Sequence, residues 1–241
     1  MPGTLPPTSV VIPAAGEGVR LPGPVRKPWR SLAGKPVLIR TLEAFRGLGF
    51  IKEVVLLVHP DDLADVKRRW SKALTALKVS CVLPGGATRT DSVAKGVLAT
   101  SETSRLVLIH DAARPLVTGA EVRAVAQAAW RGGAAILAIP ATDTVKRVDS
   151  KGIIVNTLPR KELWLAQTPQ GFKRALILKA CRRWSSKPSH LRKTPTDDAG
   201  LMETLFPVRV VAGSGGNFKL STPADLRKAR ILWNSRPGNG V

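Results

Sequence analysis

A stretch of small residues with two cations, from Pro13 to Pro28, holds the side chains of this chain that are best suited to chemistry. It directly follows the apolar run 9–12 and carries Arg20 and Lys27. Its small residues are Ala14, Ala15, Gly16 and Gly18. Small side chains let backbone N–H groups approach phosphate oxygens, and cations neutralise the remaining charge, so the stretch is a candidate polyphosphate site. Taken alone, the pattern is explained better as a tight turn that needs glycine, and it matches neither common glycine-rich nucleotide motif.

Asp111 is the candidate metal ligand of the chain. It follows the buried run 106–109 and His110. A carboxylate at the end of a buried strand suits Mg²⁺, which binds one or two carboxylates together with substrate phosphates and water. The alternative is that Asp111 caps the following turn. Arg114 either pairs with Asp111 or binds a substrate phosphate, and the ion pair is the simpler expectation.

The stretch 85–93 joins a glycine pair to the start of a helix, where exposed N–H groups can bind an anion or a base edge; a plain turn with an N-cap is the alternative. Lys219 and Arg160 are isolated cations for which a solvated surface role is the default. No Ser/His/Asp or Cys/His arrangement supports a nucleophile or a zinc site. A cation-rich site with one metal carboxylate suits phosphoryl or nucleotidyl transfer, where positioning and charge neutralisation do most of the catalysis.

Length and composition favour one α/β domain over residues 1–241. The chain has 241 residues, of which 44% are hydrophobic, and its 38 Lys and Arg against 17 Asp and Glu give a formal net charge of +21. Such a surface attracts polyanions, so a phosphate-handling enzyme and a nucleic-acid-binding protein on a transferase scaffold are both considered. The basic clusters at 67–69 and 182–183 do not form one stripe interleaved with aromatic residues, which favours the enzyme.

The cellular setting is read from cysteines and apolar runs. Cys81 and Cys181 have no paired spacing, which favours a reducing compartment. Residues 1–8 are too short and too rich in proline for a signal peptide, and no apolar run approaches the ~20 residues of a membrane-spanning helix. We therefore expect a cytoplasmic protein.

Apolar runs alternate with helical patterns along most of the chain. Strands are expected at 9–12, 53–58, 79–83, 106–109, 134–139 and 207–212, and helices at 37–48, 61–77, 88–100, 120–130, 173–184, from 196 and from 221. This alternation predicts βαβ units and a mostly parallel sheet, whose ligands lie at the carboxyl ends of the strands. The loops 13–28, 84–92 and 110–115 should therefore face one crevice.

Three further features are expected. Residues 143–148 and 153–158 form a hairpin, either an edge hairpin or a projecting arm inserted at about 142–162. The helix 61–77 should be capped by Asp61 or Asp62. Lys219 should lie in a short strand before the last helix.

Several motifs, spread in order from about Ser9 to Leu226, carry a resemblance that covers nearly the whole chain. They are PAAGEGVR with Lys27, GGATRTDSV, HDAARP, DTVKR, LWLAQTPQ, TDDA and NFKLSTPADL. Together they resemble the 2-C-methyl-D-erythritol 4-phosphate cytidylyltransferase family of the non-mevalonate isoprenoid pathway. The resemblance implies a Rossmann-like three-layer α/β/α fold, CTP as co-substrate, Mg²⁺ as the metal, release of pyrophosphate, and a homodimer joined by projecting arms.

The resemblance also implies roles for single residues. Arg20 and Lys27 would stabilise the charge at the α-phosphorus of CTP, with Lys219 joining them at the phosphates, and Asp111 would hold Mg²⁺. The cytidine pocket would be lined by Ala14, Ala15, Gly16, Gly86 and Ser92. The methylerythritol phosphate would be positioned by Arg160, Thr144, Asp111 and Arg114, with Arg160 and Thr144 reaching in from the partner's arm.

Ribitol-5-phosphate cytidylyltransferase is the nearest enzyme alternative, because it shares the fold, CTP and most of these motifs. Thr144 and Arg160 favour methylerythritol phosphate as the substrate. The chain departs from the family next to the loop lysine, since Arg26 precedes Lys27 where proline is usual and Pro28-Trp29 follow it.

Overall fold

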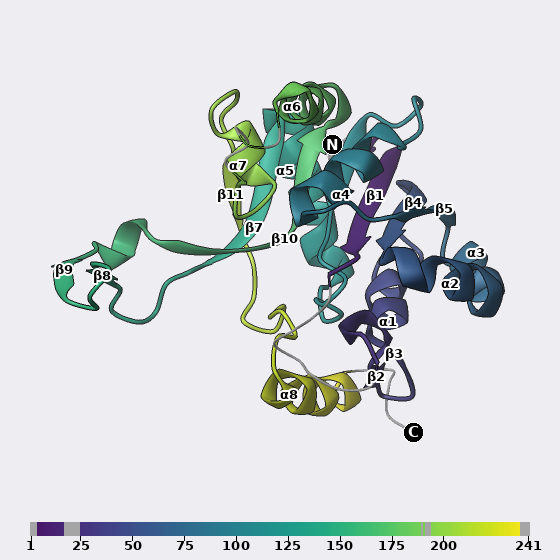
Figure 1. The fold of residues 1–241 in the computed structure, drawn as a ribbon, viewed down its shortest axis with the longest axis horizontal. Coiled ribbons are helices and arrows are strands. Elements are labelled where there is room, and N and C mark those ends of the chain that lie inside the picture. Colours follow the sequence, from purple (N-terminus) through teal and green to yellow (C-terminus); the bar gives the residue numbers. More distant parts are fainter. Residues whose placement is uncertain (1–3, 17–24, 189, 191–193, 237–241) are drawn as a thin grey trace.

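The computed structural model describes residues 4–16, 25–188, 190 and 194–236, and a seven-stranded sheet forms its centre (Figure 1). Its strands are β1 Thr8–Ala14, β4 Ile51–Val58, β5 Val79–Pro84, β6 Leu106–Ile109, β7 Ala134–Pro140, β10 Trp164–Lys173 and β11 Arg209–Ala212. They lie in the order β11-β7-β10-β6-β1-β4-β5. Neighbouring strands are parallel except at β10, which runs antiparallel to β6 and β7. The predicted mostly parallel sheet is confirmed.

Helices cover both faces of this sheet, as a three-layer fold requires. They are α1 Val37–Glu43, α2 Leu63–Arg69, α3 Ser71–Ala76, α4 Arg89–Leu98, α5 Gly119–Gly132, α6 Arg174–Ser186, α7 Ala199–Met202 and α8 Pro223–Asn234. Side chains alternate along β1, so Val10 and Ile12 join the core formed with α1, α2, α3 and α5, whereas Val11 joins the core formed with α4, α6 and α7. A third, smaller cluster, which includes Leu220 and Trp233, packs α8 near the carboxyl ends of the strands.

Local signals explain where several helices begin. Thr88 caps α4 and Asp91 completes the capping box, and Thr222 and Asp225 do the same for α8. The helix expected at 61–77 is instead a 3-10 turn, η2 Pro60–Asp62, followed by α2 and α3, which are separated at Trp70. The capping expected of Asp61 or Asp62 is wrong, because Asp62 stands at the N-cap of α2 without a side-chain capping bond and the His59 side chain accepts from the backbone of η2.

Three further segments differ from the secondary structure expected. The helix expected at 37–48 ends at Glu43 and gives way to turns. The ten-residue strand β10, which pairs with β6 and β7, was not among the expected strands. The strand expected around Lys219 is absent, and residues 218–220 have no regular secondary structure.

The hairpin forms a separate two-stranded sheet, β8 Lys146–Val148 and β9 Ile154–Thr157, which projects from the rest of the chain (Figure 1). The 3-10 turn η3 Arg160–Glu162 follows it before β10. This hairpin, with the chain that joins it to β7 and β10, is called the arm below. Of the two alternatives, the projecting arm is confirmed and the edge hairpin is wrong.

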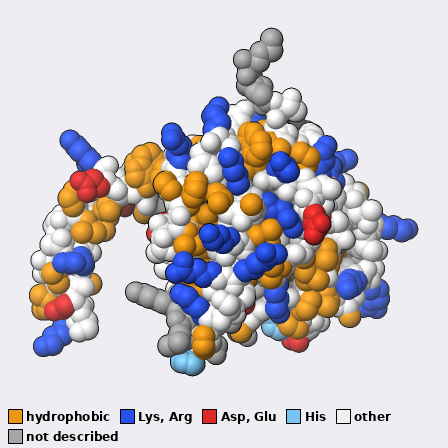
Figure 2. All heavy atoms as spheres, turned by 90° about the horizontal axis from the view of Figure 1, so that it is seen from above, with side chains coloured by type: hydrophobic (Ala, Val, Ile, Leu, Met, Phe, Trp, Pro, Cys, Tyr) orange, Lys and Arg blue, Asp and Glu red, His pale blue; other side chains and the backbone are white. Residues whose placement is uncertain are grey.

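Lys and Arg side chains are spread widely over the body of the molecule in Figure 2, and acidic side chains are few. The arm stands apart from the body in the same view. Among the described helices, none is both long enough and apolar enough to cross a membrane.

Candidate active site

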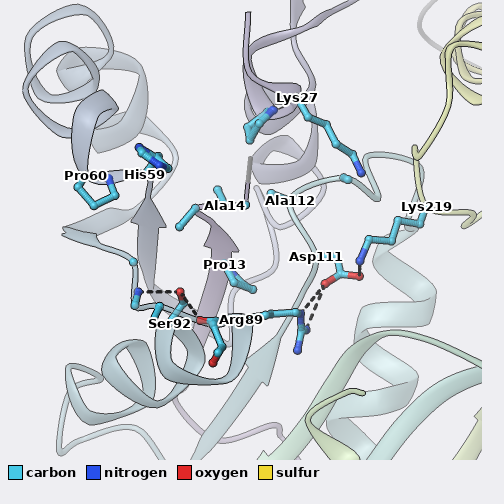
Figure 3. Close-up of a pocket in the computed structure, with 18 residues that line it drawn as sticks. Pro13, Ala14, Lys27, His59, Pro60, Arg89, Ser92, Asp111, Ala112 and Lys219 are labelled. Carbon is cyan, nitrogen blue, oxygen red and sulfur yellow. Dashed lines mark hydrogen bonds and ion pairs between the residues drawn. The ribbon is translucent and has the colours of Figure 1, made fainter. Parts of the chain in front are cut away.

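A cavity of about 780 Å³ lies at the carboxyl ends of the central strands (Figure 3). It is lined by residues 13–16, 27–28, 59–60, 85–89, Ser92, 111–113 and Lys219. The three loops expected to share one crevice therefore do so, as far as the structure describes them. In Figure 3, the side chains of Lys27 and Lys219 lie on the side of the cavity opposite Pro60 and Ser92.

Glycine is required on one wall of this cavity. A Cβ added to Gly85 would lie 2.2 Å from the Cβ of Ala15, and one added to Gly86 would lie 2.5 Å from the Cβ of Asp91. The backbone of this wall therefore borders the cavity directly. Ser92 is buried and holds the wall in place, since its Oγ accepts from the Gly86 N–H at 2.9 Å.

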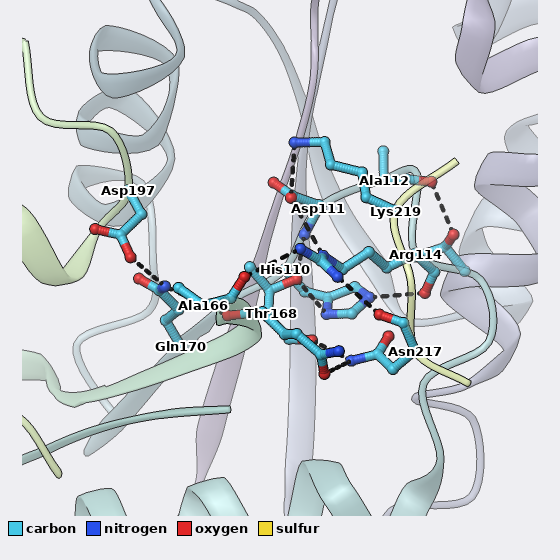
Figure 4. A network of polar contacts seen from close by, with 12 residues as sticks. His110, Asp111, Ala112, Arg114, Ala166, Thr168, Gln170, Asp197, Asn217 and Lys219 are labelled. Carbon is cyan, nitrogen blue, oxygen red and sulfur yellow. Dashed lines mark hydrogen bonds and ion pairs between the residues drawn. The ribbon is translucent and has the colours of Figure 1, made fainter. Parts of the chain in front are cut away.

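Asp111 sits among three cations, of which Arg89 is labelled in Figure 3 and Arg114 and Lys219 in Figure 4. Its Oδ1 accepts from Arg89 Nε at 3.2 Å and Nη2 at 3.1 Å, while Lys219 Nζ lies 2.9 Å and Arg114 Nε 3.5 Å from Oδ2. Burial acts to raise the pKa of the Asp111 carboxyl, but the charges of Arg89, Lys219 and Arg114 outweigh it and hold the pKa below its usual range. Asp111 is therefore an anion that orients cations at the floor of the cavity.

Sequence reasoning assigned no role to Arg89. This side chain joins Asp111 to Asp198, whose carboxylate oxygens lie 2.9 Å from Arg89 Nη1 and 2.8 Å from Nη2. Burial acts to lower the pKa of Arg89, but Asp198 and Asp111 outweigh it and raise the pKa. One signal was available, since a cation in the first turn of a helix opposes the helix dipole and so indicates nearby carboxylates.

Arg114 holds the segment that carries Lys219. Its guanidinium is buried, Nη1 donates to the Asn217 carbonyl at 2.7 Å, and the Leu220 N–H donates to the Ala113 carbonyl at 2.8 Å. These bonds hold residues 217–220 beside residues 113–114, so Lys219 reaches Asp111 although its segment is not a strand. The ion pair expected between Arg114 and Asp111 is present, and contact of Arg114 with a substrate stays a prediction.

His110 is a buried, neutral support for the same floor. Its Nε2 lies 3.1 Å from the Arg114 carbonyl, and its Nδ1 lies 3.0 Å from the Thr168 hydroxyl, which also accepts from the Asp111 N–H (Figure 4). The carbonyl can only accept, so Nε2 carries the proton and Nδ1 accepts from Thr168. Burial lowers the pKa of His110 from 6.5 to about 4.

Lowering the pH should therefore destabilise the protein through His110. Between pH 6.5 and 4 the unfolded chain binds a proton at His110 that the folded chain does not bind. The contribution of neutral His110 to the free energy of unfolding is therefore complete above pH 6.5, and it decreases as the pH falls toward 4. We expect a loss of about 2 kcal/mol between pH 7 and pH 4.5 from this group. Urea unfolding at both pH values should show a smaller loss for His110→Gln than for the wild type. An equal loss in both would contradict the prediction.

The other predicted site residues are divided between the cavity and the arm. Ala14, Ala15, Gly16 and Lys27 line the cavity. Arg20 lies outside the described residues. Thr144 and Arg160 are exposed on the arm, where Arg160 Nη1 donates to the Thr142 carbonyl at 2.7 Å, and one chain does not bring them to its own cavity.

A divalent cation fits this cavity only with help from a substrate. The described residues contain no group of three or more His, Cys, Asp or Glu side chains able to hold a metal, and Asp111 is the one carboxylate among the residues that line the cavity. Magnesium accepts this arrangement, because it binds one or two carboxylates with substrate phosphates and water. The residues present therefore fit Mg²⁺ that arrives with a nucleotide.

Comparison with known proteins identifies what the chain is similar to. The family model described as 2-C-methyl-D-erythritol 4-phosphate cytidylyltransferase matches residues 8–235. The protein of that name from Pelotomaculum thermopropionicum is 41% identical over 231 residues, which cover 95% of each chain. The crystal structure of that name from Thermus thermophilus has a TM-score of 0.72 and 36% identity, covering 92% of this chain and 96% of the other. The 4-diphosphocytidyl-2C-methyl-D-erythritol synthase of Anaerococcus prevotii has a TM-score of 0.78 and 28% identity, covering 93% and 97%.

Proposed function

Because this chain belongs to the 2-C-methyl-D-erythritol 4-phosphate cytidylyltransferase family, we propose how its residues carry out that family's reaction. The chain transfers CMP from CTP to 2-C-methyl-D-erythritol 4-phosphate, giving 4-diphosphocytidyl-2-C-methyl-D-erythritol and pyrophosphate. The phosphate oxygen of the acceptor attacks the α-phosphorus of CTP in line, and pyrophosphate leaves. The substrate supplies the nucleophile, which agrees with a cavity built from cations and glycines.

The roles of the cations rest on one observation, which is that Lys27, Lys219 and Asp111 line the same cavity. Lys27, together with Arg20, stabilises the negative charge that builds up on the phosphoryl oxygens in the transition state. Lys219 binds the CTP phosphates. The ion pair with Asp111 keeps the ammonium group of Lys219 directed at these phosphates. Positioned cations of this kind are the main source of rate acceleration in phosphoryl transfer.

The small residues of the cavity bind the nucleoside. Ala14, Ala15, Gly16 and Gly86 place backbone rather than side chains against it. The loop that contains Gly85 lies so close to the loop that contains Ala15 that a Cβ on Gly85 would clash with Ala15. We assign the flat base of CTP to the space bordered by these small residues. Ser92 supports the binding by holding the Gly86 N–H.

Asp111 would hold Mg²⁺ with the phosphates of CTP. When bound there, the ion neutralises phosphate charge and orients the triphosphate. The carboxylate of Asp111 stays ionised because Arg89, Lys219 and Arg114 face it, so it would be available as a ligand for the ion without first losing a proton.

The arm joins two copies of the chain into a homodimer and completes the acceptor site. Its apolar side chains are exposed in the single chain, with Ile153 63%, Ile154 59% and Val155 53% accessible. Several large apolar side chains exposed on one small element are typical of an interface. Thr144 and Arg160 lie on the same arm and reach the partner's cavity, where they position the polyol phosphate together with Arg114 and Asp111.

Replacing Ile154 by aspartate should separate the dimer, because a charge in the apolar interface is left without a partner. We expect sedimentation velocity to show monomers, and kcat/KM for the polyol phosphate to fall by about tenfold or more, since the interface supplies Arg160. CTP binding measured by calorimetry should be retained. Ile231→Asp is the matched control, because Ile231 is 68% exposed on α8. A dimeric Ile154→Asp variant with unchanged turnover would remove the arm from the assembly.

One assay tests the reaction and its acceptor. The purified protein is incubated with CTP, Mg²⁺ and either 2-C-methyl-D-erythritol 4-phosphate or ribitol 5-phosphate, and pyrophosphate is measured. We expect release with the methylerythritol compound. Preference for ribitol 5-phosphate would overturn the assigned acceptor, and a salt-dependent gel shift without CTP turnover would favour the nucleic-acid alternative. Location in the cytoplasm stays a prediction.

A further inference from the structure

The chain segment that carries Lys27 is tied to the turn η2 by Arg26. Arg26 Nη1 lies 2.5 Å from Asp62 Oδ1, and Nη2 lies 2.9 Å from Asp61 Oδ2. The side chains of Arg26 and Asp62 are 31% and 20% exposed, whereas that of Asp61 is 70% exposed. Because solvent weakens exposed ion pairs, the pair with Asp62 is the stronger of the two.

Trp29 ties the other side of the same segment to the same carboxylate. Its Nε1 donates to Asp62 Oδ2 at 3.1 Å, so each oxygen of Asp62 holds one donor. The ring of Trp29 also stacks on that of Trp70, with centroids 6.0 Å apart and an interplanar angle of 19°. Lys27 and Pro28 form the short 3-10 turn η1 Lys27–Trp29 between these two attachments.

Asp62 makes these contacts from within a helical stretch. Its backbone is helical, because η2 leads directly into α2, and its side chain makes no capping bond. Both carboxylate oxygens are therefore used by residues that are distant in the chain, Arg26 and Trp29. The distant contact here joins two borders of the cavity, since Lys27 lines it on one side and His59 and Pro60 on the other (Figure 3).

We propose that Arg26, Trp29 and Asp62 form a latch that positions Lys27 over the CTP phosphates. All three are positioning residues that act through Lys27. The latch replaces the proline that the family usually has before the lysine, since a proline fixes the backbone by its ring whereas Arg26 fixes it by an ion pair. This inference rests on the role proposed above for Lys27.

The first test compares two carboxylates on neighbouring turns. Asp62→Ala removes both latch contacts, and Asp65→Ala removes an equal charge that pairs with Arg68 and Arg69 on the surface of α2. We expect Asp62→Ala to lower kcat by about 10- to 100-fold, the range for a displaced catalytic group, and to leave the thermal midpoint close to that of Asp65→Ala. Trp29→Phe keeps the stacking on Trp70 but loses the N–H, and it should show a smaller loss. Equal kcat for the Asp62→Ala and Asp65→Ala variants would overturn the latch.

A double-mutant cycle separates the latch from the role of Lys27. If Asp62 acts through Lys27, adding Asp62→Ala to Lys27→Ala should change kcat by less than about threefold. Additive losses would show that Asp62 acts by another route and would overturn the proposal. A Lys27→Ala variant with wild-type kcat would remove Lys27 from the mechanism and the latch with it, whereas a large Lys27 effect with no Asp62 effect would overturn the latch alone.

Discussion

Replacing Lys27 by alanine should leave the fold intact and reduce turnover by about 10²–10³-fold, the usual effect of removing one group that stabilises transition-state charge. Lys27 lines the cavity on the same side as Lys219, and its loss leaves the phosphates with less positive charge at the moment of transfer. The reduction should fall mainly on kcat, because the small-residue wall and Lys219 still bind CTP. Pyrophosphate release under saturating CTP measures it.

Two comparison variants make this result interpretable. Lys67→Ala removes an exposed lysine from α2 and should retain wild-type turnover. Lys27→Arg keeps the positive charge and should retain part of the activity, although the planar guanidinium group places this charge differently from an ammonium group. Near-wild-type turnover of Lys27→Ala, with circular dichroism unchanged, would remove Lys27 from the mechanism.

Replacing Asp111 by alanine should reduce both activity and stability. The change leaves Arg89, Arg114 and Lys219 facing one another without the anion that separates them. Loss of one partner of a buried ion pair typically costs about 3 kcal/mol or more in the free energy of unfolding. Turnover should fall by at least about 10²-fold, because Lys219 loses its ion-pair partner and the proposed metal ion would lose its carboxylate ligand.

Asp198 supplies the control for this experiment. Its carboxylate also pairs with Arg89, but it does not line the cavity. Asp198→Ala should therefore lower the urea midpoint while the Mg²⁺ concentration for half-maximal turnover stays unchanged. Asp111→Asn, which keeps the shape of the side chain, should require more Mg²⁺. The same Mg²⁺ requirement for Asp111→Asn and wild type would show that Asp111 does not hold the metal.

Features that depend on neighbours in the chain could be predicted. The bounds of β6 and the approximate positions of every other sheet strand except β10 follow from apolar runs, and the start of α4 follows from the three-residue spacing of Thr88 and Asp91. These signals act within one turn or one strand, so the sequence contains all their partners. The meeting of the loops at one cavity followed as well, because the carboxyl ends of parallel strands share an edge.

Features that depend on distant partners could not be predicted. Arg89 was overlooked because its partners are Asp111 and Asp198, far away in the chain. The capping expected of Asp62 failed for the same reason, since its carboxylate binds Arg26 and Trp29, which are distant in the chain. Alternating polarity in the hairpin fits an edge strand and an arm equally, and only packing chooses between them.

The sequence by itself determined the class of fold, the family motifs and the residue types of the site, because propensity, periodicity and spacing are local properties. The tertiary structure decided how these residues meet. It placed Lys219 against Asp111 through the contacts of residues 113–114 with 217–220, and it attached the Lys27 segment to Asp62. It also formed a projecting arm with exposed apolar side chains (Figure 1), and Thr144 and Arg160 on this arm are not among the residues that line the cavity of their own chain. Each of these outcomes depends on which surfaces become neighbours once the core has formed, and chain order does not contain that information.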